Sequence, residues 1–191
     1  MLVRSGPPIF VPLVLAFVAL AFASAVGCGD ANNAPAAVQF DACLPLLLVP
    51  DADVSSDQLN GIAGALRLWN TSAATRIELT AAGATATDAT VTDATVTPSL
   101  PIHFQSAAAP FHGLYDDRNV QIFVNQDLVD HARIVAIAHE MGHAFGLVHV
   151  APEQRLSLMN SGNITVDPTP DDVSALAARW GRCPAPAGAQ P

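Results

Sequence analysis

The sequence predicts a single α+β domain. Short segments rich in β-branched residues alternate with longer segments whose apolar residues recur at helical spacing, a pattern typical of helices packed on a sheet. The chain of 191 residues is long enough for one domain with its own core and too short for two. We divide it into a leader (1–27), a flexible tether (28–43), the folded domain (44–183) and a disordered tail (184–191).

The leader has the features of a secretory signal peptide. Arg4 gives its start a positive charge, and residues 9–26 are uncharged and mostly apolar. Residues 25–28 resemble a bacterial lipobox, in which small residues precede a cysteine, here Cys28, that is lipidated and becomes the mature N-terminus. Simple cleavage nearby and an uncleaved anchor are the alternatives. Each predicts an exported domain, either a lipoprotein of the bacterial cell envelope or secreted, that meets the membrane only through its N-terminus.

The chain has three cysteines, an odd number for an exported protein unless one of them has another use. Lipidation of Cys28 would be such a use. Cys43 precedes the first strand-like segment and Cys183 follows the last helix-like one, so a disulfide between them would join the two ends of the domain. Two free thiols are the alternative.

The charge balance excludes one class of partner. Eight basic residues stand against seventeen acidic ones, which gives a formal net charge of -9. Because DNA and RNA binding requires a basic surface, we expect no nucleic-acid partner.

The first part of the domain predicts a strand followed by a helix. Residues 44–49 form an apolar run of strand length, and residues 50–53 are typical of a loop. Ser55, Ser56 or Asp57 can then cap an amphipathic helix that packs on a sheet. The apolar residues that recur at helical spacing in this segment are Leu59, Ile62, Ala63, Leu66 and Trp69.

A second strand is predicted at residues 76–80, where β-branched residues alternate with others. The low-complexity stretch 81–98 that follows indicates an exposed loop or an edge strand. Ca2+ bound by Asp88 and Asp93 is the alternative there, but no Asp-rich loop of the EF-hand kind supports it.

Two further strands precede a long helix. Residues 102–105 form a short candidate strand, and residues 119–125 alternate as a strand does. The helix is predicted to begin near Gln126 and to end at Gly146. A last helix has Thr169 as its cap and stops at Gly181.

The segment that indicates chemistry runs from 139 to 149. His139 and His143 are spaced i and i+4, so on a helix they share one face and can reach one cation. Gly146 lets the chain turn sharply, which would bring His149 round as a third ligand. Three protein ligands leave a fourth position open for water, as in catalytic zinc sites. Glu140 would accept a proton from that water and deliver it to a departing amine.

These residues resemble the motif of a known family, the metzincins, and within it the matrixins. Residues 139–149 match HExxHxxGxxH, and residues 157–160 match the Met-turn, so Met159 is expected to form an apolar floor beneath the zinc ligands. Residues 65–70 and 170–181 are similar to the end of the family's first helix and to its final helix. The resemblance covers about residues 44–182 and implies an exported zinc-dependent metalloendopeptidase with one catalytic Zn2+.

The resemblance also implies an architecture. We expect a zincin-like fold with a twisted, mostly parallel sheet, an antiparallel edge strand, two long helices and a small C-terminal subdomain that holds the Met-turn and the last helix. Residues 119–125 would be the edge strand, along which an extended peptide substrate binds by strand addition, and we expect a monomer. Small peptides or the cell wall remain open as other substrates, and a noncatalytic zinc-binding surface lipoprotein is the alternative function. We expect surface or packing roles for His103, His112 and His131.

Overall fold

The computed structural model describes residues 35–73, 75–83 and 97–184. Its strands and helices are β1 (Pro45–Pro50), α1 (Ser56–Ala73), β2 (Arg76–Leu79), β3 (Ser99–Gln105), β4 (Gly113–Asp116), β5 (Gln121–Asn125), α2 (Asp130–Ala144) and α3 (Pro170–Trp180). The leader with Cys28, Asp88 and Asp93, and the tail from 185 onward lie outside the described residues.

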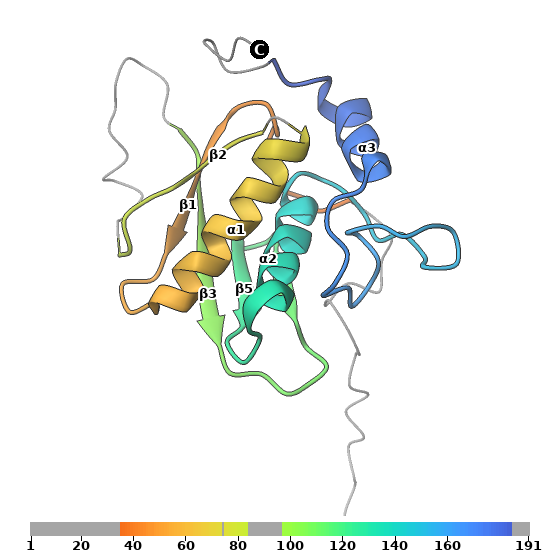
Figure 1. Ribbon diagram of the computed structural model, residues 1–191. Coiled ribbons are helices and arrows are strands. Elements are labelled where there is room, and N and C mark those ends of the chain that lie inside the picture. Colours follow the sequence, from red (N-terminus) through yellow and green to blue (C-terminus); the bar gives the residue numbers. More distant parts are fainter. Residues whose placement is uncertain (1–34, 74, 84–96, 185–191) are drawn as a thin grey trace, which may run out of the picture.

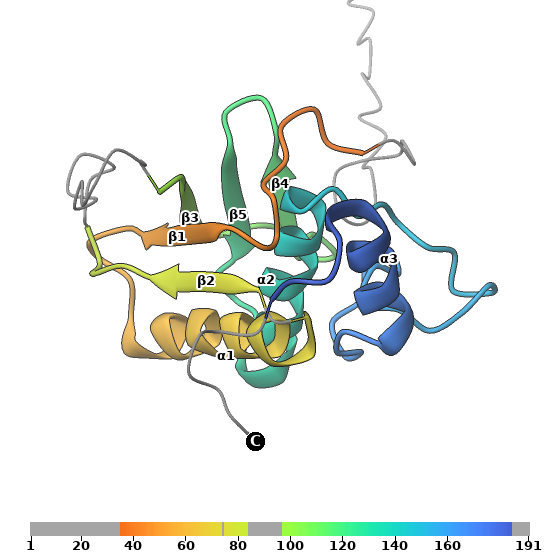
Figure 2. The same ribbon diagram turned by 90° about the horizontal axis from the view of Figure 1, so that it is seen from above.

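The strands form one mixed sheet in the order β2-β1-β3-β5-β4. The first four strands in this order run parallel to one another, and β4 pairs antiparallel with β5. Both long helices, α1 and α2, lie on the same face of the sheet, and α3 lies beside α2 (Figures 1 and 2). A mostly parallel sheet with an antiparallel edge strand is therefore present, as the sequence predicted.

The position of that edge strand differs from the prediction. Residues 119–125 were expected at the edge, but β5 pairs with β3 on one side and with β4 on the other. Both hydrogen-bonding edges of β5 are thus occupied, and the expectation is wrong. The antiparallel edge strand is β4, in a segment for which the sequence analysis predicted no strand.

Local capping decides where each helix begins. Ser55 Oγ accepts a hydrogen bond from Gln58 N at 3.2 Å, and Gln58 Oε1 accepts one from Ser55 N at 2.7 Å, so α1 starts with a reciprocal cap. The second helix starts at Asp130 and not near Gln126, because Asn125 Oδ1 accepts from Asp127 N at 3.1 Å and holds those residues in a turn. Helix α3 has the predicted cap at Thr169.

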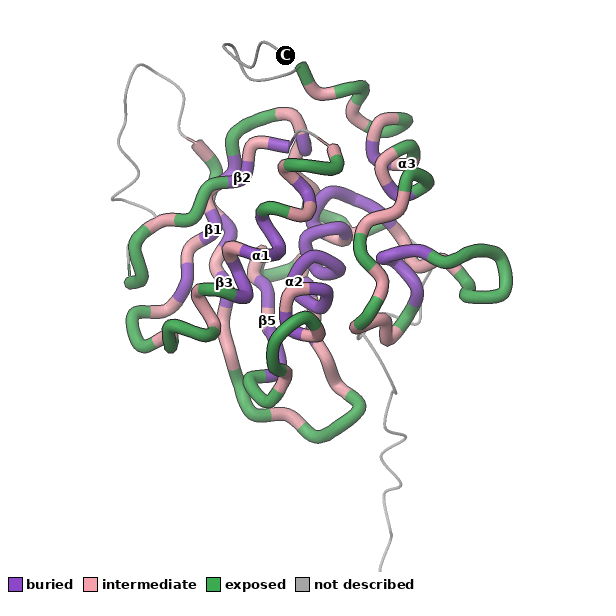
Figure 3. Tube along the Cα trace, viewed as in Figure 1, coloured by how far each residue is buried: buried purple, intermediate pink, exposed green. Residues whose placement is uncertain are grey.

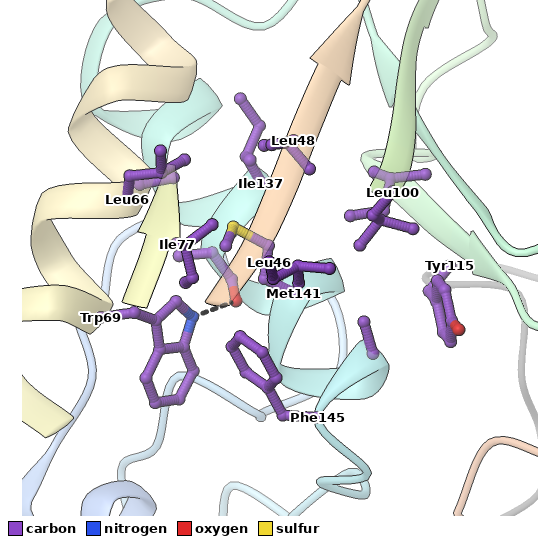
Figure 4. Close-up of a cluster of buried hydrophobic side chains, with 14 of the residues drawn as sticks. Leu46, Leu48, Leu66, Trp69, Ile77, Leu100, Tyr115, Ile137, Met141 and Phe145 are labelled. Carbon is purple, nitrogen blue, oxygen red and sulfur yellow. Dashed lines mark hydrogen bonds between the residues drawn. The ribbon is translucent and has the colours of Figure 1, made fainter. Parts of the chain in front are cut away.

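The core lies between the two long helices and the sheet, where buried residues concentrate on α2 and the central strands (Figure 3). Trp69 of α1 is fully buried, donates from Nε1 to the carbonyl of Ala138 at 2.8 Å, and meets Phe145 edge-to-face at a centroid distance of 5.9 Å (Figure 4). Gly64 allows the helices to approach, since a Cβ there would lie 2.7 Å from Ile134 Cδ1. The packing fixes α2 against the rest of the domain.

The segment before β1 is not a free tether. Phe40 N donates to the carbonyl of Ala144 at 2.8 Å, Tyr115 Oη donates to the carbonyl of Val38 at 2.9 Å, and Ala42 is buried in the core. The expectation of a flexible tether is therefore wrong for residues 35–43. The tether was expected because Asn, Ala, Pro and Asp dominate residues 28–43 and offer little to bury, but composition does not show the partners that the folded domain provides.

The structure joins Cys43 to Cys183 by a disulfide across a sequence separation of 140. This bond links the start of β1 to the chain just beyond α3. None of the helices in the described part of the chain is long and apolar enough to cross a membrane.

Removing this disulfide is expected to destabilise the domain. For so long a loop, the entropy of the unfolded chain predicts that a Cys43→Ser, Cys183→Ser double variant loses about 3–5 kcal/mol of unfolding free energy. Urea denaturation followed by tryptophan fluorescence measures this, and wild type treated with a reductant is the matched control. Equal urea midpoints for oxidised wild type and the double variant would contradict a stabilising role of the disulfide.

Candidate metal centre

Helix α2 presents two histidines on one face near its C-terminal end. His139 and His143 are one turn apart, and their rings meet edge-to-face with centroids 4.9 Å apart. His139 is 1% exposed, because most of α2 is enclosed by α1 and the sheet. The helix that carries these side chains is therefore held rigidly.

The end of α2 brings in the third histidine. Leu147 N donates to the carbonyl of Gly142 at 2.9 Å and Gly146 N donates to that of His143 at 2.8 Å, the bonding pattern of a Schellman motif. Gly146 has a φ of 85°, a conformation that favours glycine. The chain therefore reverses here, and His149 returns to face the helix.

The three imidazoles converge on one point. His149 Nε2 lies 3.2 Å from His139 Nε2 and 3.1 Å from His143 Nε2, and the three ligand atoms all lie within 4.8 Å of one another. A tetrahedral zinc ion with Zn–N bonds of about 2.0–2.1 Å requires nitrogen separations of about 3.3–3.4 Å. The group therefore suits a metal ion of that size.

Backbone carbonyls fix the tautomers of the two helix histidines. His139 Nδ1 lies 2.7 Å from the carbonyl oxygen of Leu158, and His143 Nδ1 lies 3.0 Å from that of Leu147. A carbonyl can only accept, so each Nδ1 carries the hydrogen and each Nε2 presents a lone pair to the metal.

The electrostatics of the site keep these rings neutral. Burial, followed by the neighbouring His143, lowers the pKa of His139 to about 3. Burial, followed by the neighbouring His149, lowers the pKa of His143 to about 4. Because a metal ligand must be unprotonated, the site is ready to bind a cation at neutral pH.

Glu140 belongs to α2 and contacts the edge strand β4. Its carboxylate is 1% exposed, and its Oε2 accepts a hydrogen bond from Tyr115 N of β4 at 2.8 Å. Gly113 makes room for it, since a Cβ at that position would lie 2.9 Å from Glu140 Oε1. The carboxylate of the residue that follows the first histidine is thus held by a strand that the sequence did not reveal.

Met159 is buried and packs against α2 at Gly142. A Cβ at Gly142 would lie 2.5 Å from Met159 Sδ, so the glycine between His139 and His143 admits the sulfur. The residue before Met159 contacts the candidate site as well, because the carbonyl of Leu158 accepts the hydrogen bond that orients His139.

Asp172 holds this turn in place. Its carboxylate is 1% exposed and accepts from Ser157 Oγ, from Leu158 N at 2.9 Å, and from Thr169 N at 2.9 Å. One side chain therefore caps α3 and fixes the carbonyl that orients His139. No pattern in the sequence indicated this role for Asp172.

The remaining histidines lie outside this group. His103 pairs with Asp51 at 2.9 Å, and His131 pairs with Asp167 at 3.2 Å, both at partly exposed positions. His112 stands directly before β4 and is one of the weaker causes, after burial, that lower the pKa of His139. It was expected to have a surface or packing role, and no pattern in the sequence placed it near the metal site.

Substituting Gly146 is expected to damage the metal site. Gly146→Ala places a Cβ at a positive φ and against Arg179 and Gln39, and should lower the unfolding free energy by about 1–3 kcal/mol and weaken zinc affinity at least tenfold. Gly162→Ala is the control, because Gly162 also has a positive φ, of 73°, but nothing lies within 4 Å. Calorimetric zinc titration measures both, and an equal loss of affinity in the two variants would contradict the proposed turn.

Neutralising Asp172 should affect α3 and the metal together. Asp172→Asn removes charge-assisted hydrogen bonds and should lower the unfolding free energy by about 2–3 kcal/mol, with a zinc affinity about 10–100-fold weaker. Asp171→Asn, at the exposed neighbouring position in the same helix turn, should change stability by less than about 0.5 kcal/mol. Zinc titration and denaturation of the two variants give the comparison; an unaltered affinity in Asp172→Asn would exclude the link.

Comparisons with known proteins find similarity among solved structures but not among sequences. No family model and no curated protein matches the sequence. The fold is similar to the crystal structure of metalloproteinase-II from Bacteroides fragilis, with a TM-score of 0.46 and 15% sequence identity. The match covers 84% of this chain and 57% of that chain, so this chain spans little more than half the length of its neighbour. At this similarity, the function has to be argued from the site itself.

Proposed function

We propose that the protein is a zinc-dependent metalloendopeptidase with a zincin-like fold of the metzincin type. The observation that carries the proposal is the convergence of His139, His143 and His149, together with the buried Glu140 that directly follows the first of them on α2. Three protein ligands suit a catalytic zinc, which keeps a position open, whereas a structural zinc takes four. A purely structural site would have no use for a buried acid beside it.

The metal ion and the side chains of the protein would have separate roles in the reaction. Zinc supplies a Lewis acid that activates water for attack on a carbonyl carbon. The Glu140 carboxylate accepts the proton that the attacking water loses and delivers it to the nitrogen of the departing amine. The Tyr115 N–H holds one carboxylate oxygen in place during both transfers.

The edge strand β4 provides a place for the substrate backbone. Tyr115 N faces Glu140 and not β5, whereas the carbonyl of His112 accepts from Asn125 N of β5 at 2.9 Å. Because backbone groups alternate between the two sides of a strand, Gly113 and Tyr115 direct theirs toward the site. An extended peptide that adds to this side of β4 would bring its scissile bond to Glu140 and the three histidines.

The proposal includes a location outside the cytoplasm. The signal-like leader, the lipobox at Cys28 and the pairing of Cys43 with Cys183 all suit an oxidising compartment. The domain would act at the bacterial cell envelope as a lipoprotein, or as a secreted enzyme, on proteins or peptides there.

Replacement of Glu140 should abolish peptide cleavage and leave the metal bound. Glu140→Gln keeps the shape of the side chain but cannot accept the proton, so kcat should fall about 10²–10⁴-fold. The measurement is zinc content together with cleavage of a mixed peptide library, read by mass spectrometry. Glu153→Gln, which alters an exposed glutamate, serves as the control and should cut at the wild-type rate.

The outcomes separate the candidate functions. Cleavage by wild type and the control, with a silent Glu140→Gln variant that retains zinc, supports the peptidase. If all three proteins hold zinc and none cuts a peptide, the protein is better described as a noncatalytic zinc-binding lipoprotein. If wild type holds no zinc, the metal centre itself is wrong.

A further inference from the structure

His112 is held firmly at the entrance to the edge strand. It directly precedes β4, and its carbonyl accepts a hydrogen bond from Asn125 N at 2.9 Å. The Asn125 side chain, which is 6% exposed, donates to the carbonyl of the adjacent Phe111 at 2.9 Å. Two hydrogen bonds from one buried residue therefore fix the backbone that carries His112.

This position adjoins the proposed reaction centre. The next residue, Gly113, packs against the Glu140 carboxylate so closely that a Cβ would lie 2.9 Å from Oε1. His112 also acts electrostatically on His139, whose pKa is lowered first by burial and more weakly by the neighbouring histidines, His112 among them. His112 thus directly precedes the residue that packs against the general base.

The two ring nitrogens of His112 differ in their surroundings. Nδ1 is buried and has no hydrogen-bond partner among the described residues. A buried polar atom without a partner is unfavourable and therefore calls for an explanation. Since no carbonyl or carboxylate accepts from Nδ1, the proton is better placed on Nε2, where solvent can solvate it. The ring then offers an Nε2–H donor on its accessible side.

Other roles for this imidazole fit less well. The atoms of the metal group are those of His139, His143 and His149, and His112 does not belong to it. The only tyrosine in the chain, Tyr115, donates its hydroxyl hydrogen to the carbonyl of Val38 and cannot serve as a donor at the site. Peptide hydrolysis requires donors aimed at the oxygen on which negative charge develops.

We propose that His112 is a further catalytic residue, which donates a hydrogen bond from Nε2 to the carbonyl oxygen of the scissile peptide bond as that oxygen becomes negative. No proton is transferred in this step, because the N–H bond remains intact. The proposal rests on the proposed peptidase function and on a substrate that lies along β4. It assigns a role to an imidazole that neither binds the metal nor has a structural partner for its ring.

The test compares variants with and without a donor. His112→Phe keeps the flat ring and removes both nitrogens, His112→Leu does so without a ring, and His112→Gln restores an N–H donor. His131→Phe, an exposed position on α2, is the matched control. For each zinc-loaded protein we would measure zinc content, kcat and KM on a peptide that wild type cleaves, and affinity for the phosphinic analogue of that peptide by calorimetry.

The expected result is a selective loss. His112→Phe and His112→Leu should keep zinc and melting temperature, with kcat about 10²–10³-fold lower, KM within about threefold, and phosphinate affinity reduced by a similar factor to kcat. His112→Gln should recover at least about tenfold of the lost kcat, and His131→Phe should match wild type.

Several results would overturn the proposal. A kcat within threefold of wild type in the donor-free variants would exclude a hydrogen bond to the reacting oxygen. Loss of zinc or of folding in both of them, or failure of His112→Gln to recover activity, would show a structural role. If wild type cuts no peptide, the peptidase proposal fails and the role of His112 fails with it. If wild type cuts and the variants behave as just described, only the role of His112 fails.

Discussion

The three imidazoles can share one cation because the chain reverses direction at the end of α2. The Schellman motif at Gly146 takes the chain out of the helix and returns His149 within 3.2 Å of the two helix histidines. The ligands therefore come from one continuous segment, and the rigidity of that segment depends on the burial of α2 against α1 and the sheet. A longer or freer connection would lose entropy each time the metal bound.

The remainder of the domain supports this segment from two sides. On one side, β4 places Gly113 and Tyr115 N against Glu140, so that the acid is oriented by the same strand that would receive a substrate. On the other, α3 and Asp172 hold the turn whose carbonyl orients His139. The metal ligands are thus defined locally, whereas their orientation depends on contacts between segments that are distant in the chain.

This division explains what could be predicted from the sequence. The spacing from His139 to His149 and the cap at Thr169 are local patterns, and the structure contains the histidine group and the capped helix. Strand β4 could not be predicted, because it has only four residues and both of its ends, Gly113 and Asp116, are of types depleted in strands. Contacts between segments that are distant in the chain could not be predicted either, because local sequence patterns do not show them.

Asp172 lies in the first turn of α3, and its hydrogen bonds to Ser157 and Leu158 exist only in the folded chain. Most side chains of the packed segment 35–43 are small, and the partners of the segment lie on α2 and β4. The location of His112 beside the site likewise follows from the hairpin that joins β4 to β5. In each case the missing information was the tertiary partner.

The central claim is that one zinc ion binds to three imidazoles with an open fourth position. X-ray absorption spectroscopy of the zinc-loaded protein tests it most directly. The account predicts one zinc per chain with three nitrogen ligands and one oxygen ligand at about 2.0–2.1 Å, and loss of one nitrogen ligand in His149→Ala. A sulfur ligand at about 2.3 Å, four nitrogen ligands, or a spectrum unchanged by His149→Ala would contradict it.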